Sequence, residues 1–120
     1  MKHTLLTVVA AAALSLSGTA GAQTFPTKPI TIIVPASPGG AIDLAPPLIG
    51  QTLTESTGQS VVIDNKAGAT GVIGTDFVAK AAPDGHTLAL VASSHAINPS
   101  MVKKLPFDTL KSFEPVVLTH

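Results

Sequence analysis

Two glycine-rich loops contain the first residues of this sequence that could do chemistry. Each loop follows an apolar run and opens a predicted helix, within residues 29–43 and residues 61–77. Glycine lets backbone N–H groups turn toward a bound group, and the start of a helix favours negative charge. Each loop therefore has the features of a small-anion site. Loops at the carboxyl ends of parallel strands bind ligands in open α/β sheets, so two such loops side by side predict one cleft.

The candidate ligand residues of these loops are mostly backbone donors: Gly39, Gly40 and Ala41 in the first loop, and Gly68, Ala69, Thr70 and Gly71 in the second. Two side chains have open roles. Asp43 either receives a ligand hydroxyl or amino group or caps the helix that follows. The Thr70 hydroxyl either donates to the ligand or caps the next helix. Gly74 is predicted to permit close helix packing.

A third polar segment, Ser93-Ser94-His95, follows the next predicted strand and is expected at the same edge. Its hydroxyls can donate hydrogen bonds to a carboxylate. A periplasmic serine hydrolase using Ser93 or Ser94 with His95 is the alternative. We favour a positioned, hydrogen-bonding histidine over a catalytic one, because no carboxylate lies nearby in sequence and neither serine has a nucleophile-elbow pattern. The four histidines have no metal-ligand spacing, so no metal site is predicted. Because binding is favoured over catalysis, the sequence predicts neither an enzyme nor a cofactor.

The elements that must position these residues alternate between strand and helix. A helix beginning near Pro46 or Pro47 should end at Gly58, because prolines are tolerated only in a first turn. The other expected elements are strands at 30–34, 61–63, 87–92 and from 116 to 118, a helix at 71–82, and a short helix or turn at 100–104. Such alternation implies right-handed crossovers and a parallel sheet with flanking helices, which is the α/β class.

Composition excludes several kinds of partner. All seven basic residues are lysine and the net charge is zero, so no basic patch is available for nucleic acid. Without arginine the chain has no bidentate clamp for a carboxylate, so backbone amides, hydroxyls, water or lysine must hold an anion. There is also no cysteine, which excludes disulfides and a lipid anchor at the cleavage site.

Residues 1–22 are predicted to be an export signal. A short basic start is followed by an apolar run from residue 5 to 16 and by the small residues Ala20, Gly21 and Ala22. A retained membrane anchor is the alternative, but the apolar run is shorter than the roughly 20 residues that a span requires. Cleavage near Ala22 would leave residues 23–120 as a soluble periplasmic product.

The mature part resembles the start of the tripartite tricarboxylate transporter substrate-binding proteins, also called the Bug family. Four segments carry the resemblance, in order: Lys28-Pro29-Ile30 leading to Pro38-Gly39-Gly40 and Asp43; Asp64-Asn65-Lys66 before Gly68-Ala69-Thr70-Gly71 and Ile73-Gly74-Thr75; residues 79–88 (AKAAPDGHTL); and residues 95–100 (HAINPS) followed by residues 103–108 (KKLPFD). Two departures are Pro46-Pro47, where the family has helix formers, and Lys66-Ala67, where an arginine and a proline are common.

The resemblance implies a two-lobed periplasmic binding protein fold of type II, in which residues 23–120 form part of the N-terminal lobe. It also implies a monomer that holds a small carboxylate mainly through backbone amides and ordered water. Integral-membrane transporter subunits are the implied partners. A ligand-sensing partner of a membrane sensor is the alternative role.

Overall fold

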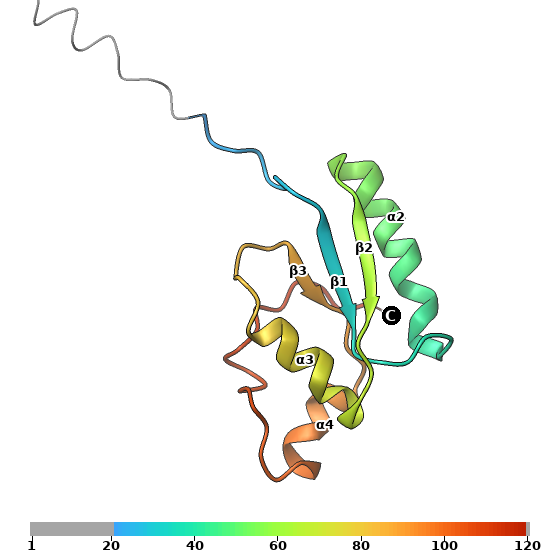
Figure 1. Cartoon of the computed structure of the whole chain (residues 1–120), viewed down its shortest axis with the longest axis vertical. Coiled ribbons are helices and arrows are strands. Elements are labelled where there is room, and N and C mark those ends of the chain that lie inside the picture. The colour runs from blue at the N-terminus through green and yellow to red at the C-terminus, as the bar shows by residue number, and fades with distance from the viewer. Residues whose placement is uncertain (1–20, 120) are drawn as a thin grey trace, which may run out of the picture.

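A computed structural model describes residues 21–119 and contains a three-stranded parallel sheet with the strand order β2-β1-β3 (Figure 1). The strands are β1 (Ile30–Val34), β2 (Val61–Asn65) and β3 (Thr87–Ala89). In register, Ile32 lies opposite Ile63 on one side and Leu88 on the other. The predicted α/β class and parallel sheet are confirmed, although β2 is two residues longer than expected and β3 is three residues shorter.

The core is centred on β1. Four of its five residues, Ile30, Ile32, Ile33 and Val34, are at most 3% exposed. A strand with neighbours on both edges and helices on both faces has no solvent-facing side, which explains why its sequence is apolar without alternation.

The first crossover contains the 3₁₀ helix η1 (Ala41–Leu44) and the helix α2 (Ala45–Thr57). The late start is confirmed, since both prolines lie in the first turn of α2, where their missing N–H groups have no intrahelical partner. Gly58 ends the helix as predicted, with a left-handed φ of 72° and its N–H donated to the Thr54 carbonyl. The helix packs on β2 through Gly50, where an added Cβ would lie 3.4 Å from both Val61 and Ile63.

The second crossover contains the 3₁₀ helix η2 (Ala69–Gly71) and the helix α3 (Val72–Ala79), so this helix ends three residues before the predicted end. It packs on β1 and β3, whereas α2 packs on β2 and β1. The two helices lie on either side of β1 in Figure 1. Since one crossover runs from β1 to β2 and the other from β2 back past β1 to β3, right-handed connections place the helices on opposite faces.

Two predictions beyond β3 are wrong. The helix expected at 100–104 is α4 (Ser94–Met101), which begins six residues earlier and contains Pro99. Residues 116–118 form no strand within the described part of the chain, because they pair with none of its three strands. Val116, Val117 and Leu118 are 75–78% exposed as a result.

The predicted export signal lies almost entirely outside residues 21–119 and stays a prediction. Within the part of the chain that the structure describes, no helix has the length and apolarity needed to cross a bilayer.

Candidate functional site

The loops that follow β1, β2 and β3 meet at one edge of the sheet, because all three strands are parallel. Backbone hydrogen bonds tie them together: the Lys66 N–H donates to the Val34 carbonyl, and the Leu90 N–H donates to the Ile33 carbonyl, both at 2.9 Å. The chain leaves β1 toward β2 and then returns past β1 to β3. The position between β1 and β3 is therefore a topological switch point, where open α/β sheets bind ligands.

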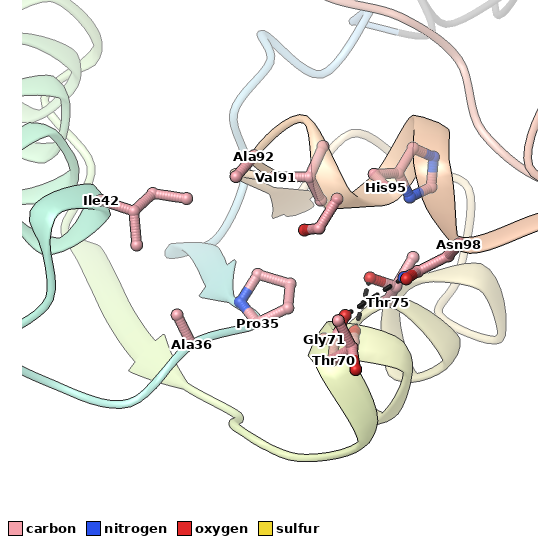
Figure 2. Close-up of a pocket in the computed structure, with 11 residues that line it drawn as sticks. Pro35, Ala36, Ile42, Thr70, Gly71, Thr75, Val91, Ala92, His95 and Asn98 are labelled. Atoms are coloured by element: carbon pink, nitrogen blue, oxygen red, sulfur yellow. Dashed lines mark hydrogen bonds between the residues drawn. The ribbon is translucent and has the colours of Figure 1, made fainter. Parts of the chain in front are cut away.

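A cavity of about 70 Å³ lies at this switch point (Figure 2). Pro35 and Ala36 line it after β1, and Val91 and Ala92 line it after β3. The remaining wall comes from the helical segments and comprises Ile42, Thr70, Gly71, Thr75, Ser94, His95 and Asn98. None of these residues is acidic, lysine or arginine. The cavity has room for about two water molecules, or for one polar group of a ligand.

The second glycine loop forms a tightly packed wall of the cavity. Four successive residues have left-handed φ angles: 127° at Gly68, 47° at Ala69, 55° at Thr70 and 86° at Gly71. An added Cβ at Gly71 would lie 3.2 Å from the Pro35 carbonyl oxygen. At Gly74 it would lie 2.8 Å from the Lys66 carbonyl oxygen, which confirms the prediction that Gly74 permits close packing.

Two buried side chains fasten this loop from outside it. The Asn98 amide Nδ2 donates to the Thr70 carbonyl at 3.1 Å, and the Thr75 hydroxyl donates to the Gly71 carbonyl at 2.8 Å. Figure 2 shows both bonds meeting at Thr70 and Gly71. The capping role for Thr70 is wrong, because α3 has Gly71 at its N-cap and no side-chain cap hydrogen bond. The exposed Thr70 hydroxyl remains a candidate ligand donor.

The first glycine loop closes on itself. The Gly39 N–H donates to Asp43 Oδ2 at 2.8 Å, and Asn65 Nδ2 donates to Asp43 Oδ1 at 2.9 Å. These two bonds, that from Gly39 foremost, lower the pKa of the Asp43 carboxyl below its usual value of 3.8. Asp43 lies within η1 rather than at its N-cap, so the capping role is wrong. Gly39, Gly40 and Ala41 are exposed and do not line the cavity.

In the third polar segment, Ser94 and His95 line the cavity, whereas Ser93 is the exposed N-cap residue of α4. The His95 ring is stacked on Phe107, with centroids 6.2 Å apart, and meets the edge of Phe113 at 5.3 Å. Its Nδ1 is buried and has no hydrogen-bond partner within residues 21–119. Aromatic packing therefore positions His95, and its predicted hydrogen bond to a ligand stays a prediction.

This geometry lacks the arrangement of a serine hydrolase. Among the described residues, no carboxylate or serine hydroxyl is hydrogen-bonded to His95, so the imidazole has neither an orienting acid nor a nucleophile to activate. A metal centre is not formed either, since residues 21–119 contain no group of three potential metal ligands.

Sequence reasoning missed two polar residues of the cavity, Thr75 and Asn98, each only 2% exposed. The spacing of each contained a signal. Thr75 lies four residues after Gly71 in a helix, and Asn98 lies four residues after Ser94, so each pair shares a helix face. Asn98 precedes Pro99, a pattern typical of turns, and α4 was expected only after it.

The sheet order, the covering helices and the cavity at the switch point define this chain as an α/β lobe with a cavity where open α/β sheets bind ligands. A family model described as "Tripartite tricarboxylate transporter family receptor" (TctC) matches residues 48–119. The chain belongs to this family.

Similar proteins also place the chain in this family. The protein BugT of Bordetella pertussis is 43% identical over 107 residues, which are 88% of this chain and 33% of that protein. The structure of the periplasmic binding protein BugD is 35% identical with a TM-score of 0.72, covering 76% of this chain and 30% of the other. MatC from Rhodopseudomonas palustris with bound malate is 36% identical with a TM-score of 0.72, covering 77% and 32%.

The chain spans about a third of the length of these proteins. The predicted fold, part of a lobe of a periplasmic binding protein, is confirmed by the two structural matches. Family members are solute-binding proteins of the periplasm rather than enzymes.

Proposed function

We propose that this protein binds a small carboxylate in the periplasm, with one end of the ligand in the cavity between β1 and β3. The observation that carries the proposal is the position of this cavity at the switch point. The cavity is lined by Gly71, just before α3, and by Ser94 and His95 at the start of α4, and none of its lining residues is acidic. Backbone N–H groups at helix starts favour an anion, and no carboxylate of the lining repels one.

The predicted ligand residues divide into two groups by position. Thr70, Gly71, Ser94 and His95 line the cavity and would contact the part of the ligand inside it. The others lie outside the cavity lining, in the exposed loops around it, and would contact the remainder of the molecule: Gly39, Gly40, Ala41, Asp43, Gly68, Ala69 and Ser93. Hydroxyl and amide donors can hold a carboxylate in the absence of arginine.

The malate bound to MatC supports a small carboxylate as the ligand class. We further propose that the protein acts as a monomer, is exported by cleavage near Ala22, and presents its ligand to the integral-membrane subunits of a tripartite tricarboxylate-type transporter. Membership of the receptor family supports this partner.

Thermal-shift measurements and calorimetry on the protein expressed from its full coding sequence test the binding proposal. The panel contains malate, succinate, citrate, aspartate and benzoate, and we expect at least one acid to raise the melting temperature. Thr70→Val removes the hydroxyl while keeping the side-chain shape, so it should weaken binding about tenfold. Thr52→Val, on the exposed side of α2, is the matched control and should leave the affinity unchanged. The absence of a shift with every acid would contradict carboxylate binding.

Uptake of the bound acid tests the transport proposal. Cells that lack this protein should lose uptake and regain it with the wild-type gene, but not with a variant that no longer binds. Normal uptake without the protein would contradict delivery while leaving the binding proposal intact.

A further inference from the structure

Asn98 has a hydrogen-bond acceptor that the described part of the chain does not use. The side chain lines the cavity and is only 2% exposed. Its Nδ2 donates to the Thr70 carbonyl at 3.1 Å, which fixes the orientation of the amide, because a carbonyl requires a donor. Its Oδ1 is buried without a partner among residues 21–119. A buried acceptor left unpaired costs free energy, and such atoms in native proteins require an explanation.

His95, which also lines the cavity, has a second unpaired atom. Its buried Nδ1 also lacks a partner within residues 21–119, and the ring is held by Phe107 and Phe113. His95 and Asn98 are three residues apart on α4 and therefore share a helix face. In the view of Figure 2, both side chains lie on the side of the cavity away from Ile42.

The size and charge of the cavity restrict what can fill these positions. A volume of about 70 Å³ admits a small polar group of a ligand. A carboxylate oxygen placed against Asn98 Oδ1 would bring two acceptors together, so the carboxylate of the ligand must lie elsewhere in the site. An ammonium group would be buried without a counter-charge, since no acidic residue lines the cavity. A neutral hydroxyl satisfies both atoms when the ring proton of His95 is on Nδ1, because the hydroxyl then donates to Oδ1 and accepts from Nδ1–H.

We propose that Asn98 Oδ1 and His95 Nδ1 form a subsite for a hydroxyl group of the ligand, so that the protein selects hydroxylated carboxylates over the same acids without the hydroxyl. The inference rests on the proposed function, since it specifies the ligand class for the same cavity. Asn98 has two roles in this arrangement. Its amide nitrogen donates to the Thr70 carbonyl in the second glycine loop, and its amide oxygen would accept a hydrogen bond from the hydroxyl of the ligand.

Matched pairs of acids test the subsite in the unmodified protein. The pairs are malate and succinate, 2-hydroxyglutarate and glutarate, and lactate and propionate, measured by calorimetry on the protein from its full coding sequence. In every pair that binds, the hydroxylated acid should bind at least about tenfold more tightly, because the other acid leaves the buried acceptor unpaired. Aspartate should bind more weakly than malate. Affinities within threefold in each pair, or tighter binding of aspartate, would overturn the proposal.

Variants assign the preference to the two residues. His95→Phe removes both ring nitrogens but keeps an aromatic ring against Phe107 and Phe113, so the fold should tolerate it. It should reduce the preference for the hydroxylated acid to about threefold or less, and Asn98→Ala should do the same. Ile42→Val is the matched control, since it alters an apolar wall of the same cavity and should change both affinities of a pair by one factor.

The outcomes separate this inference from the proposed function. If no acid binds, carboxylate binding fails and the subsite fails with it. If acids bind without regard to the hydroxyl, only the subsite fails. If the preference persists in His95→Phe and in a folded Asn98→Ala, another group recognises the hydroxyl and the proposal is wrong. Should Asn98→Ala not fold, the acid pairs and His95→Phe still decide the question.

Discussion

The loop after β1 and the loop after β2 are both rich in glycine, but their glycines serve different purposes. In the first loop, a Cβ added at Gly39 would meet nothing within 4 Å, and one at Gly40 would meet only the Ser37 carbonyl oxygen at 3.7 Å. In the second loop, a Cβ at Gly71 or Gly74 would press against the backbone of the neighbouring segments. The first loop is held by hydrogen bonds to Asp43, whereas the second is held by close packing.

This difference assigns the two loops different parts in binding. The second loop contributes Thr70 and Gly71 to the cavity and is fastened by Asn98 and Thr75, so it forms a fixed wall. The first loop is exposed beyond Ala36, and one of its donors, the Gly39 N–H, is already bonded to Asp43. A ligand that uses this N–H must displace the Asp43 carboxylate from it.

The largest expected effect comes from adding a methyl group at Gly74, the third residue of α3, which packs beside the second loop. Gly74→Ala should lower the free energy of unfolding by about 1–3 kcal/mol, because the new Cβ would lie 2.8 Å from the Lys66 carbonyl oxygen and 3.0 Å from Pro35 Cα, both backbone atoms. Gly40→Ala, its counterpart in the first loop, has a φ of −79° and open space, so it should change stability by less than about 0.5 kcal/mol. Denaturant unfolding of both variants checks this. Equal losses would remove the distinction between a packed and an open loop.

A smaller effect of opposite sign is expected at Thr70. Its left-handed φ of 55° strains a branched side chain, so Thr70→Gly should raise the free energy of unfolding by about 0.5–1 kcal/mol after the entropy cost of glycine. The same variant should bind the carboxylate more weakly, because the hydroxyl donor is lost. If Thr70→Gly raised the free energy of unfolding and weakened carboxylate binding, the strained backbone at Thr70 would be retained for binding.

Ser56→Gly is the control for this substitution. It places glycine in the last turn of α2, at a residue with helical angles, where stability should fall by up to about 0.5 kcal/mol. If Thr70→Gly were as destabilising as Ser56→Gly, the second loop would not store strain.

The comparison of the two loops also shows what the sequence could and could not predict. The apolar run of β1 and the prolines and glycine that bound α2 have local causes, so those elements were predicted correctly. Strand order has no local cause. The sequence indicated a cleft between the two glycine loops, which are indeed neighbours, but the cavity opens toward β3 because the chain returns past β1.

The missed parts depend on tertiary contacts. Pro99 is tolerated inside α4, where Asn98 is buried against the second loop, and the contact of α4 with that loop has no local cause in the sequence. The apolar residues Val116, Val117 and Leu118 have the composition of a strand, yet a strand also requires a partner for its backbone.

The smallest expected effect concerns the hydrogen bonds of the first loop. The pKa of Asp43 is lowered in the folded protein, so its bonds to Gly39 and Asn65 are complete above about pH 4, the ordinary range of the unfolded carboxyl. They are lost as the pH falls through the lower folded value. Asp43→Asn, which offers one acceptor oxygen in place of two, should weaken one of these bonds at every pH and remove the pH dependence.

Amide exchange of Gly39 measures this directly. Exchange should be faster in Asp43→Asn than in the wild type at pH 6, with a melting temperature unchanged within about 2 °C because the bond from Gly39 is exposed. The Thr75 hydroxyl bond to Gly71 gives the contrast, since Thr75→Val removes a buried bond of the second loop and should lower the melting temperature by several degrees. If the two variants lowered the melting temperature equally, hydrogen bonds would stabilise both loops alike, and close packing alone would distinguish the wall of the cavity from its rim.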